Sequence, residues 1–160
     1  MNPRFFSALL LTIVALAGLP LASRASHAMG WTGLAVRVEC DNRAILVEPA
    51  EGAKIVYYWI HSVELTPIVE VYKVTPRGLV LVEGKARSFG AGHPYNAEEL
   101  GGRFYITRDW LVYTANYTIG PSLRITGSKD YYRALYIVLP EGENFTLCAG
   151  FERASIEVAP

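Results

Sequence analysis

The sequence predicts an all-β fold, either a single antiparallel β-sandwich or a small barrel, preceded by an N-terminal signal helix. Short runs of β-branched and aromatic residues recur along the chain, and Gly, Pro, Asn and Asp separate them. No segment of useful length after Ala28 has a helical period. Regularly spaced strands with turn residues between them are typical of sandwiches and barrels. A chain of 160 residues, 51% hydrophobic, can bury one core, and nothing indicates a second.

The N-terminus has the layout of a secretory signal. Arg4 supplies a positive charge, residues 5–19 are almost all apolar, and Pro20 is followed by small residues up to Ala28. We therefore expect residues 1–28 to be a signal peptide, with an uncleaved anchor as the alternative, because the apolar run is slightly short for a membrane span. Residues 29–160 would then form a single all-β extracytoplasmic domain, secreted or anchored to the outer face of the cytoplasmic membrane.

The charge balance argues against nucleic acid as a partner. The chain has fifteen basic and fifteen acidic residues, so their charges balance. A chain without an excess of positive charge has no field to hold a phosphate backbone or an anionic bilayer.

The two cysteines are consistent with a location outside the cytoplasm. Cys40 ends the first expected strand and Cys148 lies in the next-to-last, and an even pair outside the cytoplasm commonly forms a disulfide. Two buried free thiols are the alternative. Asn116 and Asn144 each begin a glycosylation sequon, which is weak further support.

The expected strands follow one another with little between them. The first two form a hairpin across Asp41 and Asn42, and the third to fifth form a meander. A polar, glycine-containing loop at residues 90–102 separates the two halves of the chain. Strands are expected at residues 34–39, 44–48, 54–63, 68–74, 79–83, 104–107, 110–118, 122–125, 131–139, 145–148 and 155–158.

The central stretch, residues 55–74, carries more polar side chains than a plain core strand needs. These candidate binding residues are His61, Ser62, Glu64, Thr66 and Glu70. A tight turn at residues 65–66 would place His61 opposite Glu70, about 5 Å apart at Cβ, close enough for a hydrogen bond. Ser62 would point to the other face, so a Ser-His-Glu hydrolase triad is not expected. The common interpretation of such a pair is structural, fixing the hairpin.

A divalent metal is a weaker alternative at the same place. His61, Glu70 and the later His93, or Glu64 in its stead, would supply mixed nitrogen and oxygen ligands. The spacing matches no zinc signature, so no resident cofactor is expected.

A second motif follows at Ser88, Gly90, Ala91, Gly92 and His93. Its two glycines can adopt positive φ, so that successive N–H groups could form a nest for a carboxylate. A sharp corner is the plainer interpretation, and the motif is not a phosphate loop because no Lys-Ser or Lys-Thr follows.

The two motifs, H-S-V-E-L-T-P-I-V-E at residues 61–70 and S-F-G-A-G-H-P at residues 88–94, resemble domain-of-unknown-function family eighteen-fifty. The resemblance covers roughly residues 34–153, with His93 standing where a small or apolar residue is expected. It implies a small extracytoplasmic protein associated with a TAXI-type TRAP transporter, and it brings no established activity. The implied partners are the transporter's membrane subunit or its solute-binding protein.

Three hypotheses result. The first is an extracytoplasmic accessory or ligand-binding module that recognises a transporter subunit or a small carboxylate. The second is a metal-dependent or acid–base envelope enzyme that uses His61 with Glu64 or Glu70. The third is a structural envelope protein whose motifs only stabilise the fold.

Overall fold

The computed structural model describes residues 33–49, 52–87, 98 and 101–159, and within these ranges the chain is built from β-strands. The predicted strand order holds, with boundaries shifted by a few residues. The first five strands are β1 (Ala35–Cys40), β2 (Arg43–Val47), β3 (Lys54–Ile60), β4 (Pro67–Thr75) and β5 (Gly78–Ala86). The remaining six are β6 (Phe104–Ile106), β7 (Leu111–Gly120), β8 (Ser122–Thr126), β9 (Arg133–Val138), β10 (Asn144–Ala149) and β11 (Arg153–Ala159).

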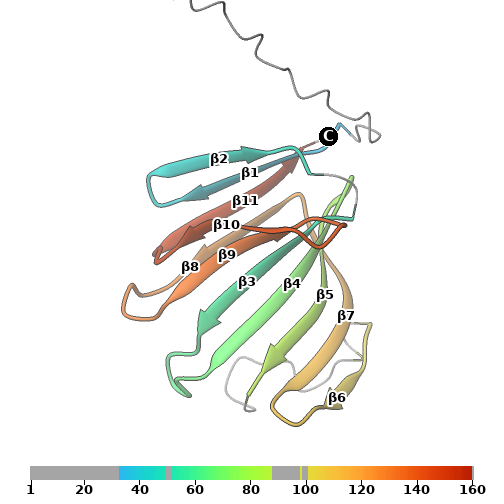
Figure 1. Ribbon diagram of the computed structural model, residues 1–160, viewed down its shortest axis with the longest axis vertical. Coiled ribbons are helices and arrows are strands. Elements are labelled where there is room, and N and C mark those ends of the chain that lie inside the picture. The colour runs from blue at the N-terminus through green and yellow to red at the C-terminus, as the bar shows by residue number, and fades with distance from the viewer. Residues whose placement is uncertain (1–32, 50–51, 88–97, 99–100, 160) are drawn as a thin grey trace, which may run out of the picture.

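Two antiparallel sheets of unequal size make up the fold (Figure 1). The smaller sheet has the order β2-β1-β11-β8, and the larger has the order β10-β9-β3-β4-β5-β7-β6. The all-β prediction is confirmed, and of its two forms the structure is a sandwich. Four strands cannot cover seven completely, so part of the larger sheet's inner face lies beyond the smaller sheet.

The apolar core lies between the two sheets. β1 and β11 alternate buried and more exposed residues, which is the pattern of strands with one face inward. Their inward side chains pack in one cluster with those of β3, β4, β5 and β9. The largest fully buried side chains are Ile55, Ile68, Leu79, Leu135, Ile137, Ile156, Val36, Val38 and Val74.

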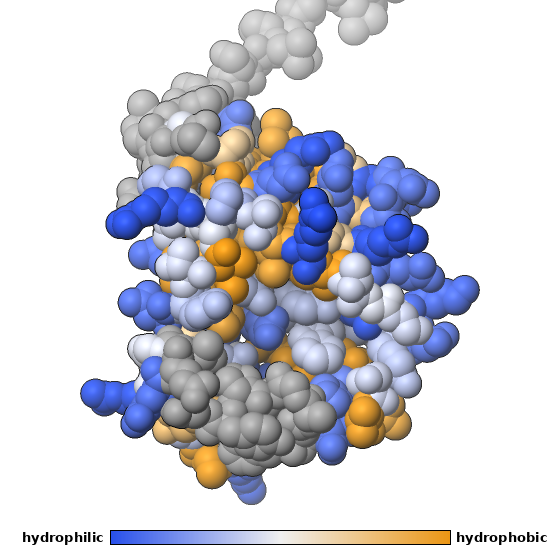
Figure 2. All heavy atoms as spheres, turned by 180° about the vertical axis from the view of Figure 1, so that it is seen from behind, coloured by the Kyte–Doolittle hydropathy of each residue, from blue (hydrophilic) through white to orange (hydrophobic). Residues whose placement is uncertain are grey.

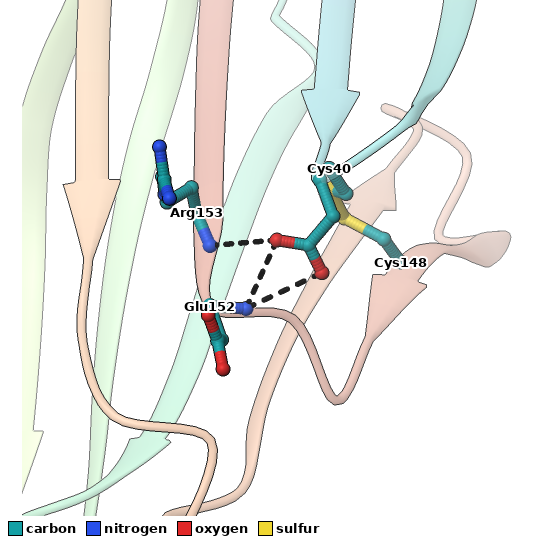
Figure 3. Close-up of a disulfide and its surroundings, with 5 residues drawn as sticks. Cys40, Cys148, Glu152 and Arg153 are labelled. Carbon is teal, nitrogen blue, oxygen red and sulfur yellow. Dashed lines mark hydrogen bonds between the residues drawn. A yellow bond between two sulfur atoms is a disulfide. The ribbon is translucent and has the colours of Figure 1, made fainter.

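A disulfide joins the two sheets, as the sequence predicts. Cys40 on β1 is bonded to Cys148 on β10, with the two Cα atoms 6.4 Å apart (Figure 3). Beside it, the Asp41 carboxylate accepts hydrogen bonds from the backbone N–H groups of Glu152, at 3.2 Å, and Arg153, at 3.0 Å. Asp41 has φ of 50°, which Asp tolerates better than most residues, and the two bonds satisfy donors where the chain enters β11. The β1–β2 turn is thereby fixed to the start of the last strand.

The expected signal segment, residues 1–28, lies outside the described residues. Among the residues that are described, none belongs to a helix with the length and apolar character of a membrane span.

Candidate functional site

The turn between β3 and β4 is wider than the sequence predicts. β3 ends at Ile60, and residues 61–66 form the connection, closed by hydrogen bonds from His61 N–H to the Thr66 carbonyl and from Leu65 N–H to the His61 carbonyl, both 2.9 Å. Leu65 has φ of 53°, in the left-handed region. The predicted strand through residue 63 is therefore wrong, because the backbone closes on itself three residues earlier.

His61 is held inside this turn. Only 6% of its surface is exposed, and its Nδ1 accepts hydrogen bonds from the backbone N–H groups of Val63, at 3.3 Å, and Glu64, at 3.2 Å. The ring packs against Trp59, with centroids 5.6 Å apart. Because Nδ1 accepts from N–H groups, that nitrogen carries no proton in this arrangement. The His61 side chain thus stabilises the turn by accepting hydrogen bonds from the backbone of the turn.

The predicted cross-strand pair of His61 and Glu70 is not formed. Glu70 lies opposite Tyr57, four residues earlier in the chain than His61. At the usual rise of a strand, His61 lies roughly 13 Å further along the sheet. The wider turn is the reason, since every residue added to a connection shifts the register of the strands that it joins.

Glu70 instead belongs to a row of residues that crosses the larger sheet. Directly opposed residues of antiparallel strands place their side chains on the same face. Through successive pairings the row runs from β9 to β6. We call it the Glu70 row: Leu135, Tyr57, Glu70, Gly84, Tyr113 and Phe104.

Gly84 leaves room in this row for an aromatic ring. A Cβ atom built on Gly84 would overlap the Tyr113 ring, which therefore lies across β5 in the direction of Glu70. Tyr72, two residues beyond Glu70 on β4, donates a hydrogen bond of 2.6 Å from its hydroxyl to Glu70 Oε2. Tyrosines thus surround the carboxyl group on the inner face.

Burial controls the protonation of this group. Desolvation raises the pKa of Glu70, and the hydrogen bond from Tyr72 opposes the rise. The pKa of Tyr72 and that of Tyr113 are raised well above their ordinary value, first by burial and then by the Glu70 charge. Burial also raises the pKa of Tyr57, and the Arg133 guanidinium opposes that rise. The arrangement favours a protonated carboxyl and neutral phenols.

Arg133 and Trp59 form the next row towards the 61–66 turn. They are directly opposed on β9 and β3, on the same face as the Glu70 row. Arg133 is only 6% exposed, and its Nη1 donates to the carbonyls of Ser128 and, at 3.0 Å, Tyr131. Two buried N–H groups, Arg133 Nε and Trp59 Nε1, have no hydrogen-bond partner among the described residues.

The other predicted binding residues fall into two groups. Ser62 and Glu64 are exposed on the 61–66 turn, and Thr66 is half-buried at its end. The second motif, with Ser88, Gly90, Ala91, Gly92 and His93, lies outside the described residues. Arg87, the last described residue before it, follows β5 at the same end of the sheet as the 61–66 turn. The carboxylate nest at this motif remains a prediction.

One of the chemical alternatives loses the geometry on which it depended, whereas the use of His61 with Glu64 remains a prediction. An acid–base pair of His61 with Glu70 is not formed, because the two residues lie in different rows. Across the described parts of the chain, no group of three or more His, Cys, Asp and Glu side chains could hold a metal ion. The third ligand of the weaker metal set, His93, is not among those residues.

Sequence reasoning missed the tyrosines, Arg133 and Gly84. One signal was available: a glycine inside a strand, here in V-E-G-K, often marks a place where another group approaches the backbone closely. Tyr57 and Tyr72 gave no such signal, because aromatic residues on strands are ordinary core residues.

Comparison with known protein families shows the family to which the chain belongs. It matches the family described as Domain of unknown function (DUF1850) over residues 55–146, more than half of its length, and it belongs to that family. The matched residues begin in β3 and end in β10, so they include the Glu70 row and the 61–66 turn. Neither the curated proteins nor the solved structures contain a match.

Proposed function

We propose that this DUF1850 protein is an extracytoplasmic accessory domain of a TAXI-type TRAP transporter, which docks on the transporter's solute-binding protein through one end of the larger sheet. The observation that carries the proposal is a set of exposed apolar side chains at that end. Val63 is 74% exposed, Leu65 66% and Ile106 75%. Tyr132, 49% exposed, precedes β9, the strand next to β3.

Strand pairing brings these residues to one end although they are far apart in sequence. Val63 and Leu65 lie on the 61–66 turn, and the carbonyl of Tyr132 accepts a hydrogen bond from Ile60 N–H at 3.1 Å. Ile106 pairs with Leu111 at the start of β7. In Figure 2, hydrophobic side chains in orange lie at both lower corners, where Figure 1 has the β3–β4 turn and the β6–β7 hairpin. We call Val63, Leu65, Ile106 and Tyr132 the apolar rim.

Large apolar side chains that water surrounds on a protein surface favour burial against a partner. Hydrophilic side chains in blue dominate the upper right of Figure 2, although single apolar side chains are exposed elsewhere, among them Leu46 on β2 (65%) and Phe145 on β10 (52%). The disulfide supports an oxidising, extracytoplasmic location.

The path of the chain favours the solute-binding protein over the membrane subunit. The start of β1 lies at the end of the molecule opposite the turn between β3 and β4 (Figure 1). If the leader remains as an anchor, it holds the apolar rim away from the bilayer. A soluble partner can reach the rim in that position, and it can also do so if the leader is removed.

The test is a binding measurement with purified partners. The described domain is immobilised and titrated separately with the solute-binding protein and with the detergent-solubilised membrane subunit of a co-encoded transporter. Replacing the rim pair by V63D/L65D should weaken binding by about a hundredfold, because each buried apolar anchor typically contributes about 1–2 kcal/mol or more.

A matched control is V56D, a charge placed on the outward face of the same sheet, half-buried but away from the rim. Binding of the membrane subunit instead of the solute-binding protein would redirect the proposal. Binding of neither partner, or equal binding by V63D/L65D, would leave a structural envelope protein as the better description.

A further inference from the structure

We infer that the domain carries a binding site for a small oxyanion, such as a carboxylate, at Arg133 and Trp59 on the inner face of the larger sheet. This site is separate from the apolar rim and uses neither of the two sequence motifs. It is carried by two buried donors that no group of the described chain satisfies.

Arg133 is the first of these donors. Its guanidinium is always charged, and it is only 6% exposed. No carboxylate among the described residues forms an ion pair with it; its bonds go to two backbone carbonyls and the phenol of Tyr57. Buried charges in proteins are ordinarily paired, so the site lacks one negative charge.

The Nε–H group is the part of the guanidinium that is available to bind an anion. The Nη1 side is fixed against the segment that joins β8 to β9, where a Cβ on Gly127 would overlap the guanidinium. The group is therefore held in one orientation by the backbone, and its Nε–H has no acceptor in the described part of the chain. Such rigid placement is what a binding site needs and what a merely solvated arginine lacks.

Trp59 supplies the second donor. It lies directly opposite Arg133, so the two side chains leave the sheet on the same face with Cβ atoms about 5 Å apart. Its indole is packed between Tyr57, with centroids 6.1 Å apart, and His61. Its Nε1–H is buried and has no partner among the residues that the structure describes. An indole nitrogen only donates, so both groups require an acceptor.

A single acceptor with negative charge satisfies both donors and the missing charge together. Leaving a buried donor without a partner is expensive, and native proteins rarely leave two on neighbouring residues. A water molecule would satisfy the donors but not the charge. An oxyanion does both, and charge-assisted hydrogen bonds to it are stronger than those to water.

Anion titration tests this site on the purified protein. Sodium acetate and sodium sulfate probe planar and tetrahedral oxyanions, and sodium chloride at equal ionic strength is the reference. We expect acetate or sulfate to raise the unfolding temperature and to change tryptophan fluorescence in a saturable way. W59F should weaken the apparent dissociation constant about tenfold through the loss of one charge-assisted hydrogen bond.

The controls separate this site from general salt effects. W110F changes a tryptophan that packs under Arg87, and it should keep the wild-type affinity. R133K keeps the charge but removes Nε–H, and it should bind at least as weakly as W59F. Equal responses to all three salts would show only a general salt effect and overturn the inference. An acetate or sulfate response that persists unchanged in both W59F and R133K would also overturn it. Neither outcome affects the binding test at the apolar rim, which uses different residues.

Discussion

The two halves of the larger sheet's inner face bury different chemistry. In the half that faces the smaller sheet, Ile55, Val74, Leu79 and Ile137 join an apolar cluster with β1 and β11. In the half nearer the 61–66 turn, aromatic and polar side chains, with Glu70 and Arg133 among them, share the inward positions of the same strands with apolar residues such as Ile68. Along β3 the inward residues change from Ile55 to Tyr57 and Trp59, and the buried His61 follows directly after the strand.

Buried side chains in the two halves therefore need different things from their neighbours. An apolar side chain needs only a neighbour of fitting shape, and cores tolerate swaps that conserve volume. A buried polar group needs a directed partner, and its loss leaves a cost that packing does not offset. We call the two regions the core half and the turn half, and we expect the turn half to be the more specific and the less tolerant of substitution.

The largest expected effect comes from breaking the link between the sheets. C40A/C148A removes the disulfide, which closes a separation of 108 residues. A loss of about 2–5 kcal/mol is expected, because the unfolded chain regains the freedom that the bond removes. Thermal unfolding followed by circular dichroism, compared with the wild type under oxidising and reducing conditions, measures it. Identical midpoints for the oxidised wild type and the double variant would contradict the prediction.

A smaller effect is expected from filling the space at Gly84. G84A puts a methyl group where the Tyr113 ring lies, and overpacking of this kind typically costs about 1–3 kcal/mol. Urea titration of G84A, Y113A and G84A/Y113A gives the coupling between the two positions. The alanine at residue 84 should be nearly harmless once the ring is gone. Additive losses would show that the ring does not lie over β5.

The smallest effect at neutral pH is expected from E70Q, and it depends on pH. The pKa of folded Glu70 lies above its ordinary value of 4.5, so the folded protein holds this proton more tightly than the unfolded chain. Ionisation of Glu70 therefore costs folding stability. This cost is absent below the ordinary pKa, grows as the pH rises towards the pKa of the folded protein, and has its full size above that pKa. E70Q removes it, since the amide remains neutral and still accepts from Tyr72.

The comparison is made by thermal unfolding over a pH series. E70Q and the wild type should be nearly equal at pH 4, and E70Q should become the more stable protein as the pH rises. As a control, E83Q changes a carboxylate on the adjacent strand that pairs with Lys85 at 2.9 Å, and it should show no such gain. An E70Q protein that is less stable than the wild type at every pH would indicate a charged Glu70 with a partner of its own.

The fold could be predicted from the sequence because each strand carries its own signal. Alternation in β1 and the β-branched run of β3 have the period of a strand, and turn residues such as Pro76 and Gly78 mark the ends. The Cys40–Cys148 bond followed from the even count and the expected export. These are local or compositional features, and they do not depend on how distant parts of the chain are arranged in the fold.

The site could be predicted only in outline, because it depends on register. The 61–70 motif does lie at a distinctive turn, but the pairing of its residues is set by the hydrogen bonds of His61 and by the left-handed Leu65. A four-residue change in opposition brought Tyr57 to Glu70 and removed His61 from it. Arg133 comes from a strand far along the chain, and no local pattern indicates that its Nε–H is left without an acceptor.

The smaller sheet has a consequence for the time at which the domain can complete itself. β11 lies between β1 and β8 and pairs with both, and it is made of residues 153–159. The sheet that shields the core therefore cannot assemble until those residues have been synthesised, whereas β3, β4 and β5 can pair long before as a local meander. During biosynthesis the larger sheet must spend an interval with its inner face bare, when a chaperone or a premature disulfide partner could reach it.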